Sequence, residues 1–495
     1  MSSITVSLNG KNTCIEAETG ENLLEVLRRA GFSLKAPCGG NGKCGKCIVS
    51  LKHSGPWVTA CACKTMVTED CTVRLPSSDA DLSWNDTNSE TAYFAEGRGL
   101  GAAVDLGTTS IAVSLFDLYT GRKLASCGQW NRQQSWGADV ISRIDYTLSN
   151  ETGLSVLSSC VREQISDMIC TLAEQSSRSS AEVTSVFIAG NTVMEHLFAG
   201  LSPKSIASAP FMPLSFFTDS TLFPCGRFSA RLSPCISGYV GGDISAGLLA
   251  AGLDKSEGKH LFLDAGTNGE LALGGKNGFI TCAVACGPAF EGAGITCGMP
   301  AEYGAIHKVY ESDYGISFEV LGGGKAKGLC GSGLLDLVAV LIDYGYIDES
   351  GCLCCEDGSD AFYLTENVFL TVRDIRQLQL AKAAVAAGIR VLMHLSGSSF
   401  DDIDSLVLAG GFGSRLSPES AVKIGMLPRE LLGKVKPMGN TSLAGAEMAL
   451  LSSRERERLL QIRSMCSYTE LSLSAEFSDC FIEEMAFSEA EIMEE

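Results

Sequence analysis

Three cysteines near the N-terminus have the spacing that most clearly predicts chemistry in this chain. Cys38, Cys44 and Cys47 form a C-x5-C-x2-C pattern, and four of the eight residues between Cys38 and Cys47 are glycines. Glycines allow a short loop to turn tightly, so that sulfur atoms converge on one metal centre while backbone N–H groups approach it. The pattern predicts an iron–sulfur cluster. The alternative is a zinc knuckle, although zinc sites usually pair two short cysteine clips.

The fourth ligand has two candidates within residues 59–65, Thr-Ala-Cys-Ala-Cys-Lys-Thr. Plant-type [2Fe–2S] ferredoxins space their first three ligands C-x4-C-x2-C, and the pattern here, one residue longer, resembles the adrenodoxin-like branch of the ferredoxins. The resemblance favours Cys63, because Ala-Cys-Lys-Thr is similar to the closing Ala-Cys-x-Thr of that family. Cys61 is the alternative, and the loop between the third and fourth ligands is shorter than in typical ferredoxins.

The elements that must position these cysteines are those of a small β-grasp domain. Residues 4–18 predict two strands around a turn at Asn9-Gly10, and the apolar residues of 23–27 share one helical face that ends at Gly31. Strand, strand, helix and cysteine loop is the order of the β-grasp ferredoxins. We therefore expect a [2Fe–2S] ferredoxin-like domain at residues 1–76.

A different chemistry is predicted at residues 101–113, which read as a buried strand, a glycine turn and a second strand. At the end of the first strand, Asp105 offers a carboxylate for a magnesium-bound water. Gly107 lets the backbone approach a phosphate, while Thr108 and Thr109 supply hydroxyl and N–H donors. Taken alone, the pattern would also fit a plain hairpin turn.

The same pattern recurs about 160 residues later, at residues 261–273. Here Asp264 ends the strand, and Gly266, Thr267 and Asn268 take the positions of the phosphate-binding loop. Two such hairpins facing each other across a cleft resemble the ATPase superfamily of actin, sugar kinases and heat-shock chaperones. The resemblance implies ATP and Mg²⁺ as cofactors.

Three further segments match this superfamily in the expected order. One glycine-rich segment would let adenosine lie flat on the backbone, and two helices rich in small residues would cross at a hinge. We therefore predict a multidomain α+β and α/β fold, in which the ferredoxin-like domain precedes a two-lobed actin-like (ASKHA) ATPase with lobes at 99–237 and 238–463. The adenosine glycines are Gly410, Gly411 and Gly413, and the hinge helices include 240–247 and 439–446.

Six other phrases are too particular for a generic ATPase. Together with the N-terminal cluster domain they resemble the ATP-dependent reductive activators of corrinoid proteins, and the resemblance extends from Ser3 to about Phe487. It implies that the chain transfers one electron from a [2Fe–2S] cluster to Co(II) in a corrinoid methyltransferase system and so restores Co(I). The phrases lie at 131–134, 137–144, 189–194, 286–292, 328–333 and 374–382.

The resemblance also implies roles for the site residues and a partner. Asp105 and Asp264 would hold Mg²⁺ and orient the attacking water, and the threonines and Asn268 would contact the phosphates. The partner would be a corrinoid protein that carries its own cobalamin-type cofactor, served by an upstream low-potential reductant. Glu270 and Glu291 are candidates for water activation, with purely structural roles as the alternative.

The same residues leave two other functions open. The chain could be an ATP-driven electron donor to another low-potential acceptor, such as a dehydratase or a reductase. It could also be an electron-transfer module whose ATPase lobes only sense nucleotide. Stimulation of ATP hydrolysis by a Co(II) corrinoid protein, and not by a Co(I) form, would separate the three.

The composition limits the partners and the compartment. A net charge of −20 argues against nucleic acid and anionic membranes, and no apolar run reaches the length of a membrane span. The 21 cysteines are expected to stay reduced, as in the cytoplasm of an anaerobe. We therefore expect a cytoplasmic protein, and a homodimer through the ATPase domain is left open.

Two segments outside the predicted domains are acidic. Residues 77–98 contain Arg98 as their only basic residue and predict a flexible linker that would let the cluster domain swing. Residues 464–495 contain nine aspartates and glutamates and no lysine or arginine. The apolar residues among them have a helix-like spacing, which predicts either a capping helix or a docking surface for a basic partner.

Overall fold

The computed structural model describes residues 1–487 with the exception of 9, 33, 35, 37–38, 41, 43–44, 77–96, 267 and 355–357. Three predictions fall outside the described residues: the ligands Cys38 and Cys44, the phosphate-binding Thr267, and nearly all of the linker. The chain forms two compact units. The first holds the N-terminal domain with Arg98–Ser215 and Ser220–Arg231, and the second holds Phe216–Asp219 and the chain from Leu232 onward.

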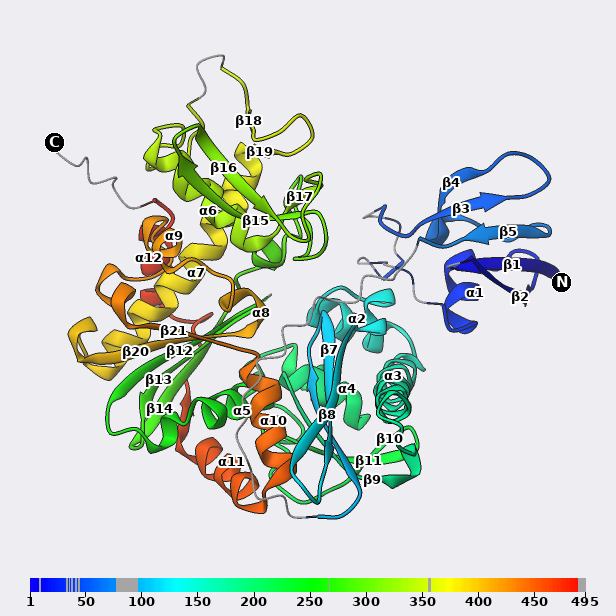
Figure 1. Ribbon diagram of the computed structural model, residues 1–495, viewed down its shortest axis with the longest axis horizontal. Coiled ribbons are helices and arrows are strands. Elements are labelled where there is room, and N and C mark those ends of the chain that lie inside the picture. Colours follow the sequence, from blue (N-terminus) through cyan, green and yellow to red (C-terminus); the bar gives the residue numbers. More distant parts are fainter. Residues whose placement is uncertain are drawn as a thin grey trace. The chain divides into compact units, whose positions relative to one another are not determined.

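The N-terminal domain is a five-stranded sheet with one helix (Figure 1). The strand order is β2-β1-β5-β3-β4, with β1 antiparallel to β2 and parallel to β5. The predicted helical face is confirmed, because Leu23, Leu24, Val26 and Leu27 are all buried in the core of this domain. The elements are β1 Ser2–Leu8, β2 Lys11–Ala17, α1 Leu23–Arg29, β3 Ile48–Lys52, β4 Val58–Cys61, η1 Ala62–Lys64 and β5 Cys71–Arg74.

The second sheet belongs to the first unit and has six strands in the order β10-β11-β9-β6-β7-β8. Strand β6, which carries Asp105, lies between its parallel neighbour β9 and its hairpin partner β7. Strand β6 is buried almost throughout, as expected for a strand whose residues are mostly apolar. The elements are β6 Leu100–Leu106, β7 Ser110–Asp117, β8 Arg122–Trp130, η2 Arg132–Ser135, α2 Val140–Ser149, α3 Gly153–Gln175, η3 Ser180–Glu182, β9 Val183–Gly190, α4 Thr192–Ala199, η4 Lys204–Ile206, β10 Phe223–Cys225 and β11 Phe228–Leu232.

The third sheet repeats this arrangement in the second unit, in the order β21-β20-β12-β13-β14-β22. Strand β12, which carries Asp264, again lies between a parallel neighbour, β20, and an antiparallel hairpin partner, β13. The two aspartate strands thus occupy equivalent places in their sheets. The strands are β12 Lys259–Ala265, β13 Gly269–Gly275, β14 Gly278–Val284, β20 Ile403–Ala409, β21 Val435–Gly439 and β22 Cys466–Tyr468.

The two helices predicted from their small residues pack closely in the second unit. A Cβ on Gly445 of α10 would lie 2.1 Å from the carbonyl oxygen of Ala246 in α5. A Cβ on Gly247 of α5 would lie 3.0 Å from the Oγ1 of Thr441 in α10. Only glycine permits this approach of the two backbones. The helices are α5 Gly242–Ala251 and α10 Thr441–Leu451.

Two small sheets and the remaining helices complete the second unit. The longest helix, α7, is long and apolar enough to span a membrane, but 78% of its most apolar window is buried inside the protein, as in the core helix of a globular domain. The elements are η5 Leu253–Lys255, η6 Pro288–Glu291, β15 Ala305–Ser312, β16 Gly315–Val320, β17 Gly328–Leu329, α6 Gly331–Asp343, β18 Ala361–Tyr363, β19 Phe369–Thr371, α7 Val372–Ser396, η7 Phe400–Asp402, α8 Gly410–Gly413, α9 Pro418–Lys423, η8 Arg429–Lys434, α11 Ser453–Met465 and α12 Ala475–Glu483.

The acidic C-terminal helix α12 packs along α7 (Figure 1). The buried side chain of Lys382 donates a hydrogen bond to the carbonyl of Ala486, and its ammonium group lies 5.7 Å from the ring centre of Phe487. Arg390 pairs with Glu483 and Glu484 at 2.8 and 3.0 Å. These contacts fit the interpretation of residues 464–487 as a capping segment.

Candidate functional site

Two of the predicted cluster ligands lie side by side in the N-terminal domain. Cys47 directly precedes β3, Cys63 lies in η1, and their Sγ atoms are 3.2 Å apart. Two thiolates that share one tetrahedral metal at bond lengths of about 2.3 Å lie within about 4 Å of each other. The pair therefore fits one iron of a [2Fe–2S] cluster. Cys61 makes a different contact, because its Sγ lies 3.9 Å from the carbonyl oxygen of Gly45 in the same cysteine loop.

Residues that the sequence did not single out hold these cysteines in place. Asn22 caps α1 by accepting a hydrogen bond from the backbone N–H of Leu24, and its amide donates to the carbonyl of Cys63 at 2.9 Å. Arg28, on the same helix, donates to the carbonyl of Gly39 in the cysteine loop at 3.3 Å. An asparagine immediately before an apolar helix was the available signal for the cap.

Three asparagine and glutamine side chains donate hydrogen bonds to the Asp105 loop of the first unit. Asn131 donates to the carbonyl of Gly107 at 2.9 Å, and Gln134 donates to the carbonyl of Thr109 at 2.6 Å. Asn191, the cap of α4, donates to the hydroxyl of Thr108 at 2.9 Å. These bonds fix the loop carbonyls and one hydroxyl, so the predicted donors of the loop are oriented before nucleotide binds.

Arg143 is the centre of this support. Its guanidinium is fully buried and donates to the carbonyl of Thr108 at 2.6 Å, to the carbonyl of Gly137 at 3.0 Å and to the Oε1 of Gln133 at 3.2 Å. Burial lowers the pKa of Arg143 to about 10, so the group stays charged at neutral pH. Three of the phrases singled out in the sequence, at 131–134, 137–144 and 189–194, thus converge beneath one loop.

The Asp264 loop of the second unit has a different support. The loop turns at Gly266, whose N–H donates to the carbonyl of Asn268 at 2.9 Å. Asp264 lies opposite Ala409 of the parallel strand β20, where the chain continues into the glycines of α8. Gly410 has a φ of +79°, and a Cβ at this position would lie 2.5 Å from the Oδ1 of Asp264. The structure therefore brings Asp264 and the predicted adenosine glycines together.

Glu270 lies opposite Asp264 across the β12–β13 hairpin. Burial, and then the neighbouring carboxylates of Asp243 and Asp264, raise the pKa of Glu270 well above its ordinary value. A higher pKa shifts a carboxyl group toward its protonated form, which donates a hydrogen bond and cannot take a proton from water. This favours the structural alternative for Glu270. Asp243, in the first turn of α5, is an acidic neighbour that the sequence did not single out.

Glu291 remains a candidate for water activation. Its Oε1 lies 4.0 Å from the place a Cβ on Gly266 would take, so the carboxylate borders the phosphate-binding loop. The preceding residue, Phe290, stacks on Phe412 of α8 with ring centres 4.7 Å apart and planes at 13°. The 286–292 phrase thus connects the Asp264 loop to the glycines of α8.

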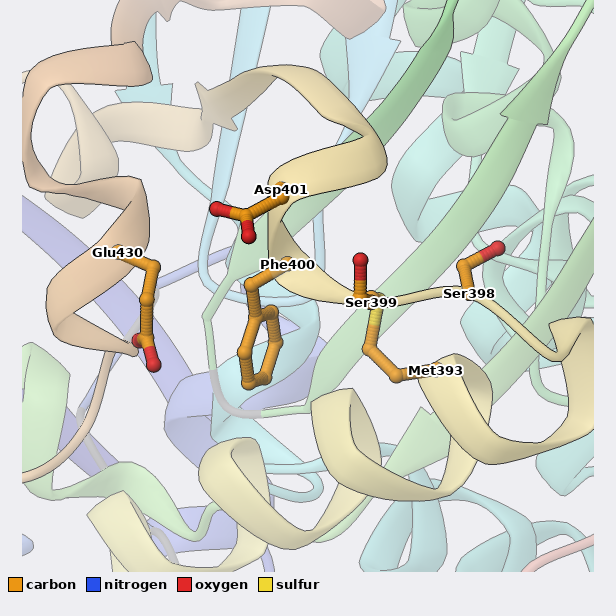
Figure 2. A pocket seen from close by; sticks show the side chains of 6 residues that line it. All are labelled: Met393, Ser398, Ser399, Phe400, Asp401 and Glu430. Carbon is orange, nitrogen blue, oxygen red and sulfur yellow. The ribbon is translucent and has the colours of Figure 1, made fainter.

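A separate pocket of about 280 Å³ lies where α7 ends and η7 follows (Figure 2). Two carboxylates, Asp401 and Glu430, line it together with Met393, Phe400 and two serines, and none of the predicted nucleotide residues does. This pocket therefore does not coincide with the residues predicted to bind nucleotide.

Comparison with known proteins decides the family. Family models match residues 6–69 as a 2Fe-2S iron-sulfur cluster binding domain, residues 100–256 as the RACo middle region and residues 258–494 as the C-terminal domain of RACo, the ASKHA domain. A solved structure described as a reductive activator for corrinoid, iron-sulfur protein is 30% identical, has a TM-score of 0.71 and covers 98% of each chain. This chain belongs to the family of reductive activators of corrinoid proteins.

Two curated relatives extend the comparison for this reductive activator. The corrinoid activation enzyme RamQ of Eubacterium limosum is 29% identical over 94% of this chain and 96% of its own. The [Co(II) methylated amine-specific corrinoid protein] reductase of Methanosarcina barkeri is 24% identical over 78% of this chain and 77% of its own. The family and the fold predicted from the sequence, a ferredoxin-like domain followed by an ASKHA ATPase, are confirmed.

Proposed function

We propose that this reductive activator uses ATP to return one electron to a corrinoid protein whose cobalt has oxidised from Co(I) to Co(II). The observation that carries the proposal is the similarity to corrinoid activators along nearly the whole chain. Both curated relatives are named for corrinoid activation or corrinoid reduction. A corrinoid protein is therefore favoured over the dehydratase or reductase that the sequence left open as acceptor.

The electron moves uphill in this proposal, which is why ATP is needed. A bound [2Fe–2S] cluster supplies a one-electron carrier, whose potential in plant-type ferredoxins is roughly −400 mV, and base-on Co(II) is harder to reduce. Each 59 mV of mismatch costs about tenfold in the equilibrium constant of a one-electron transfer. If the nucleotide-bound activator binds the Co(I) form of the corrinoid protein more tightly than the Co(II) form, this binding raises the Co(II)/Co(I) reduction potential.

The thiols proposed to hold the cluster keep the assignment made from the sequence. The 3.2 Å approach of Cys47 and Cys63 supports this pair over Cys61, whose Sγ contacts the carbonyl oxygen of Gly45. The proposed ligands are Cys38, Cys44, Cys47 and Cys63.

The nucleotide site is proposed to use both aspartate loops. Each aspartate ends the central strand of its sheet, which supports a role in holding Mg²⁺ and orienting the attacking water. The contact between Asp264 and Gly410 supports a joint site for phosphate and adenosine in the second unit. Phosphate contacts are assigned to Gly107, Thr108, Thr109, Gly266, Thr267 and Asn268, and adenosine contacts to Gly410, Gly411 and Gly413.

The remaining assignments belong to the same proposal. We place a cluster domain at 1–76, a linker at 77–98, ATPase lobes at 99–237 and 238–463, and a capping segment at 464–495. A cytoplasmic location and a low-potential reductant complete it, and a homodimer through the ATPase domain stays open.

Anaerobic spectroscopy tests the function directly. The cluster-loaded protein is mixed with reductant, Mg²⁺ and a Co(II) corrinoid protein from a methyl-transfer system, and the Co(I) absorption is followed with and without ATP. We expect Co(I) to form only with ATP, and to be lost in Asp105→Asn and Asp264→Asn but kept in the control Asp313→Asn, which changes an exposed turn. Equal reduction without ATP, or in both loop variants, would overturn the proposal.

A further inference from the structure

The charge of this chain is divided unevenly between its cluster domain and the rest. Residues 1–76 contain nine lysines and arginines and six aspartates and glutamates, which gives this domain a net charge of +3. Because the whole chain has a net charge of −20, the rest of the chain has a net charge of −23. Between Val26 and Thr68, a stretch that contains every candidate cluster ligand, there are seven basic residues and no acidic one. The cluster-binding part of the domain is therefore basic within an acidic protein.

The acidic residues of the domain do not cancel this charge near the thiols. Glu21 pairs with Arg29, and Glu25 pairs with Arg28, so these carboxylates offset two of the seven basic residues and leave the five lysines of the stretch. The other four lie in β2 and just after it, at Glu16 and Glu18, or before β5, at 69–70. None of them adjoins a cysteine of the cluster site in the sequence.

Two exposed lysines adjoin the two described ligands. Lys46 directly precedes Cys47 and Lys64 directly follows Cys63, and both side chains are exposed. The 3.2 Å approach of the two Sγ atoms brings these lysine-bearing segments together. Lys64 also borders the cysteine loop, because a Cβ on Gly42 would lie 3.0 Å from its Cε.

Two large apolar side chains are exposed on the same segments. Ile48 follows Cys47 with 47% of its surface exposed, and Met66 lies three residues after Cys63 with 51% exposed. We call Lys46, Ile48, Lys64 and Met66 the cluster-end surface. Exposed apolar groups beside like charges suit small, transient electron-transfer interfaces, where charge speeds the encounter and a short apolar contact completes it.

We propose that the cluster-end surface docks an acidic, low-potential electron-carrier protein, which is the reductant of the cluster. Charge complementarity selects this occupant, since the −23 body repels an acidic carrier and only the cluster domain attracts it. In the reaction the reduced carrier loses one electron and the cluster gains it, with no bond made or broken. The inference rests on the proposed function for the presence of the cluster, and it adds the chemistry of the upstream partner.

The test measures binding and cluster reduction before any ATP or corrinoid protein is added. Flavodoxin, a small acidic flavoprotein, is the probe: its oxidised form is titrated by calorimetry, and its hydroquinone reduces the cluster in stopped flow. The full-length variant Lys46→Glu/Lys64→Glu is compared with Lys11→Glu/Lys52→Glu, which has the same net charge. Lys11 begins the edge strand β2, and Lys52 ends β3, about 17 Å along the chain from Cys47. Photoreduced deazaflavin serves as a small reductant without charge complementarity.

The cluster-end variant should bind flavodoxin at least tenfold more weakly and be reduced by it at least tenfold more slowly at low ionic strength. The control should stay within about threefold of wild type, deazaflavin should reduce all three proteins alike, and salt near 0.5 M should remove the difference. If the charge reversal prevents cluster loading, Lys46→Gln/Lys64→Gln and the calorimetry decide.

Two results would overturn the proposal. One is a flavodoxin affinity and rate that do not respond to salt or respond equally in both variants. The other is a cluster-end variant that accepts electrons from flavodoxin normally but, once reduced, delivers them slowly to a Co(II) corrinoid protein, which would assign this surface to the corrinoid partner. Failure of ATP-dependent cobalt reduction alone would overturn the proposed function and leave the docking result standing.

Discussion

The guanidinium of Arg143 donates a hydrogen bond of 2.6 Å to the backbone carbonyl of Thr108, from a position with no exposure to solvent. The same group reaches Gly137 and Gln133, so one buried cation ties α2 and η2 to the Asp105 loop. The N–H and hydroxyl donors of this loop are predicted to face phosphate. The backbone carbonyls of the same loop also need hydrogen-bond donors. Arg143 supplies the donor for one of those carbonyls, that of Thr108.

Substitution of Arg143 should therefore impair ATP turnover through the Asp105 loop, because the Arg143 side chain itself is not proposed to contact nucleotide. Arg143→Met leaves several buried acceptors unpaired at about 1–3 kcal/mol each, and we expect ATP hydrolysis to fall at least tenfold together with a lower thermal midpoint. Arg143→Lys, which keeps the charge but not the planar fork, should show an intermediate loss. The control is Arg132→Met, because the Arg132 side chain is partly exposed and pairs with Asp167. Steady-state ATPase rates equal to wild type in Arg143→Met would contradict the supporting role.

The glycines of α8 should separate into a structural one and a nucleotide-contacting one. Gly410→Ala is strained by its φ of +79° and meets Asp264 at 2.5 Å, so the free protein should be destabilised. Gly411→Ala meets nothing within 4 Å, so the free protein should melt as wild type does. If adenosine lies on this backbone, Gly411→Ala should still weaken ATP binding in equilibrium dialysis. Wild-type affinity in Gly411→Ala would place adenosine elsewhere.

The two candidates for the fourth cluster ligand can be distinguished by metal analysis. Cys63→Ser should lose most of its iron and the visible absorption of the cluster, because a serine oxygen replaces the thiol 3.2 Å from Cys47. Cys61→Ser should keep both, since that thiol contacts the carbonyl of Gly45 instead. Iron and zinc are measured together in anaerobically purified protein. Iron lost from Cys61→Ser and kept in Cys63→Ser would reverse the assignment, and zinc in the wild type would exclude the cluster.

The raised pKa of Glu270 predicts a pH-dependent stability with a definite sign. Its ordinary pKa is 4.5 and its folded pKa lies well above that, so the folded protein binds the proton more tightly than the unfolded chain. Wild-type stability should fall as pH rises above 4.5, by about 1.4 kcal/mol per unit until the folded pKa is reached. Glu270→Gln lacks this loss, so its advantage over wild type should grow with pH in that window.

Urea unfolding of the two proteins from pH 5 to pH 7 measures that difference. A constant difference across the window would mean that Glu270 is ionised in the folded protein. In that case it would return as a candidate for water activation. Asp343→Asn, an exposed carboxylate at the end of α6 that pairs with Lys423, provides the comparison for surface charge.

Periodicity and turn chemistry alone were enough to predict the local elements. The apolar face of α1 could be read from the spacing of Leu23 to Leu27, and the two aspartate strands from their apolar runs, because both patterns report which side of a short segment is buried. The glycines of α5 and α10 likewise predicted two closely packed helices. Such information is carried by residues near one another in the chain, so a single sequence contains it.

The supports of the sites required the tertiary structure. Arg143 lies 35 residues from Thr108, and Asn22 lies 41 residues from Cys63, so no local pattern connects either pair. The raised pKa of Glu270 depends on burial and on Asp243, which arise only when α5 and β13 come together. The sequence determined which cysteines could hold a metal cluster and which residues could bind phosphate. Folding decided which backbone carbonyls, hydroxyls and carboxylates surround them, because hydrogen bonds and desolvation depend on distance in space and not on separation along the chain.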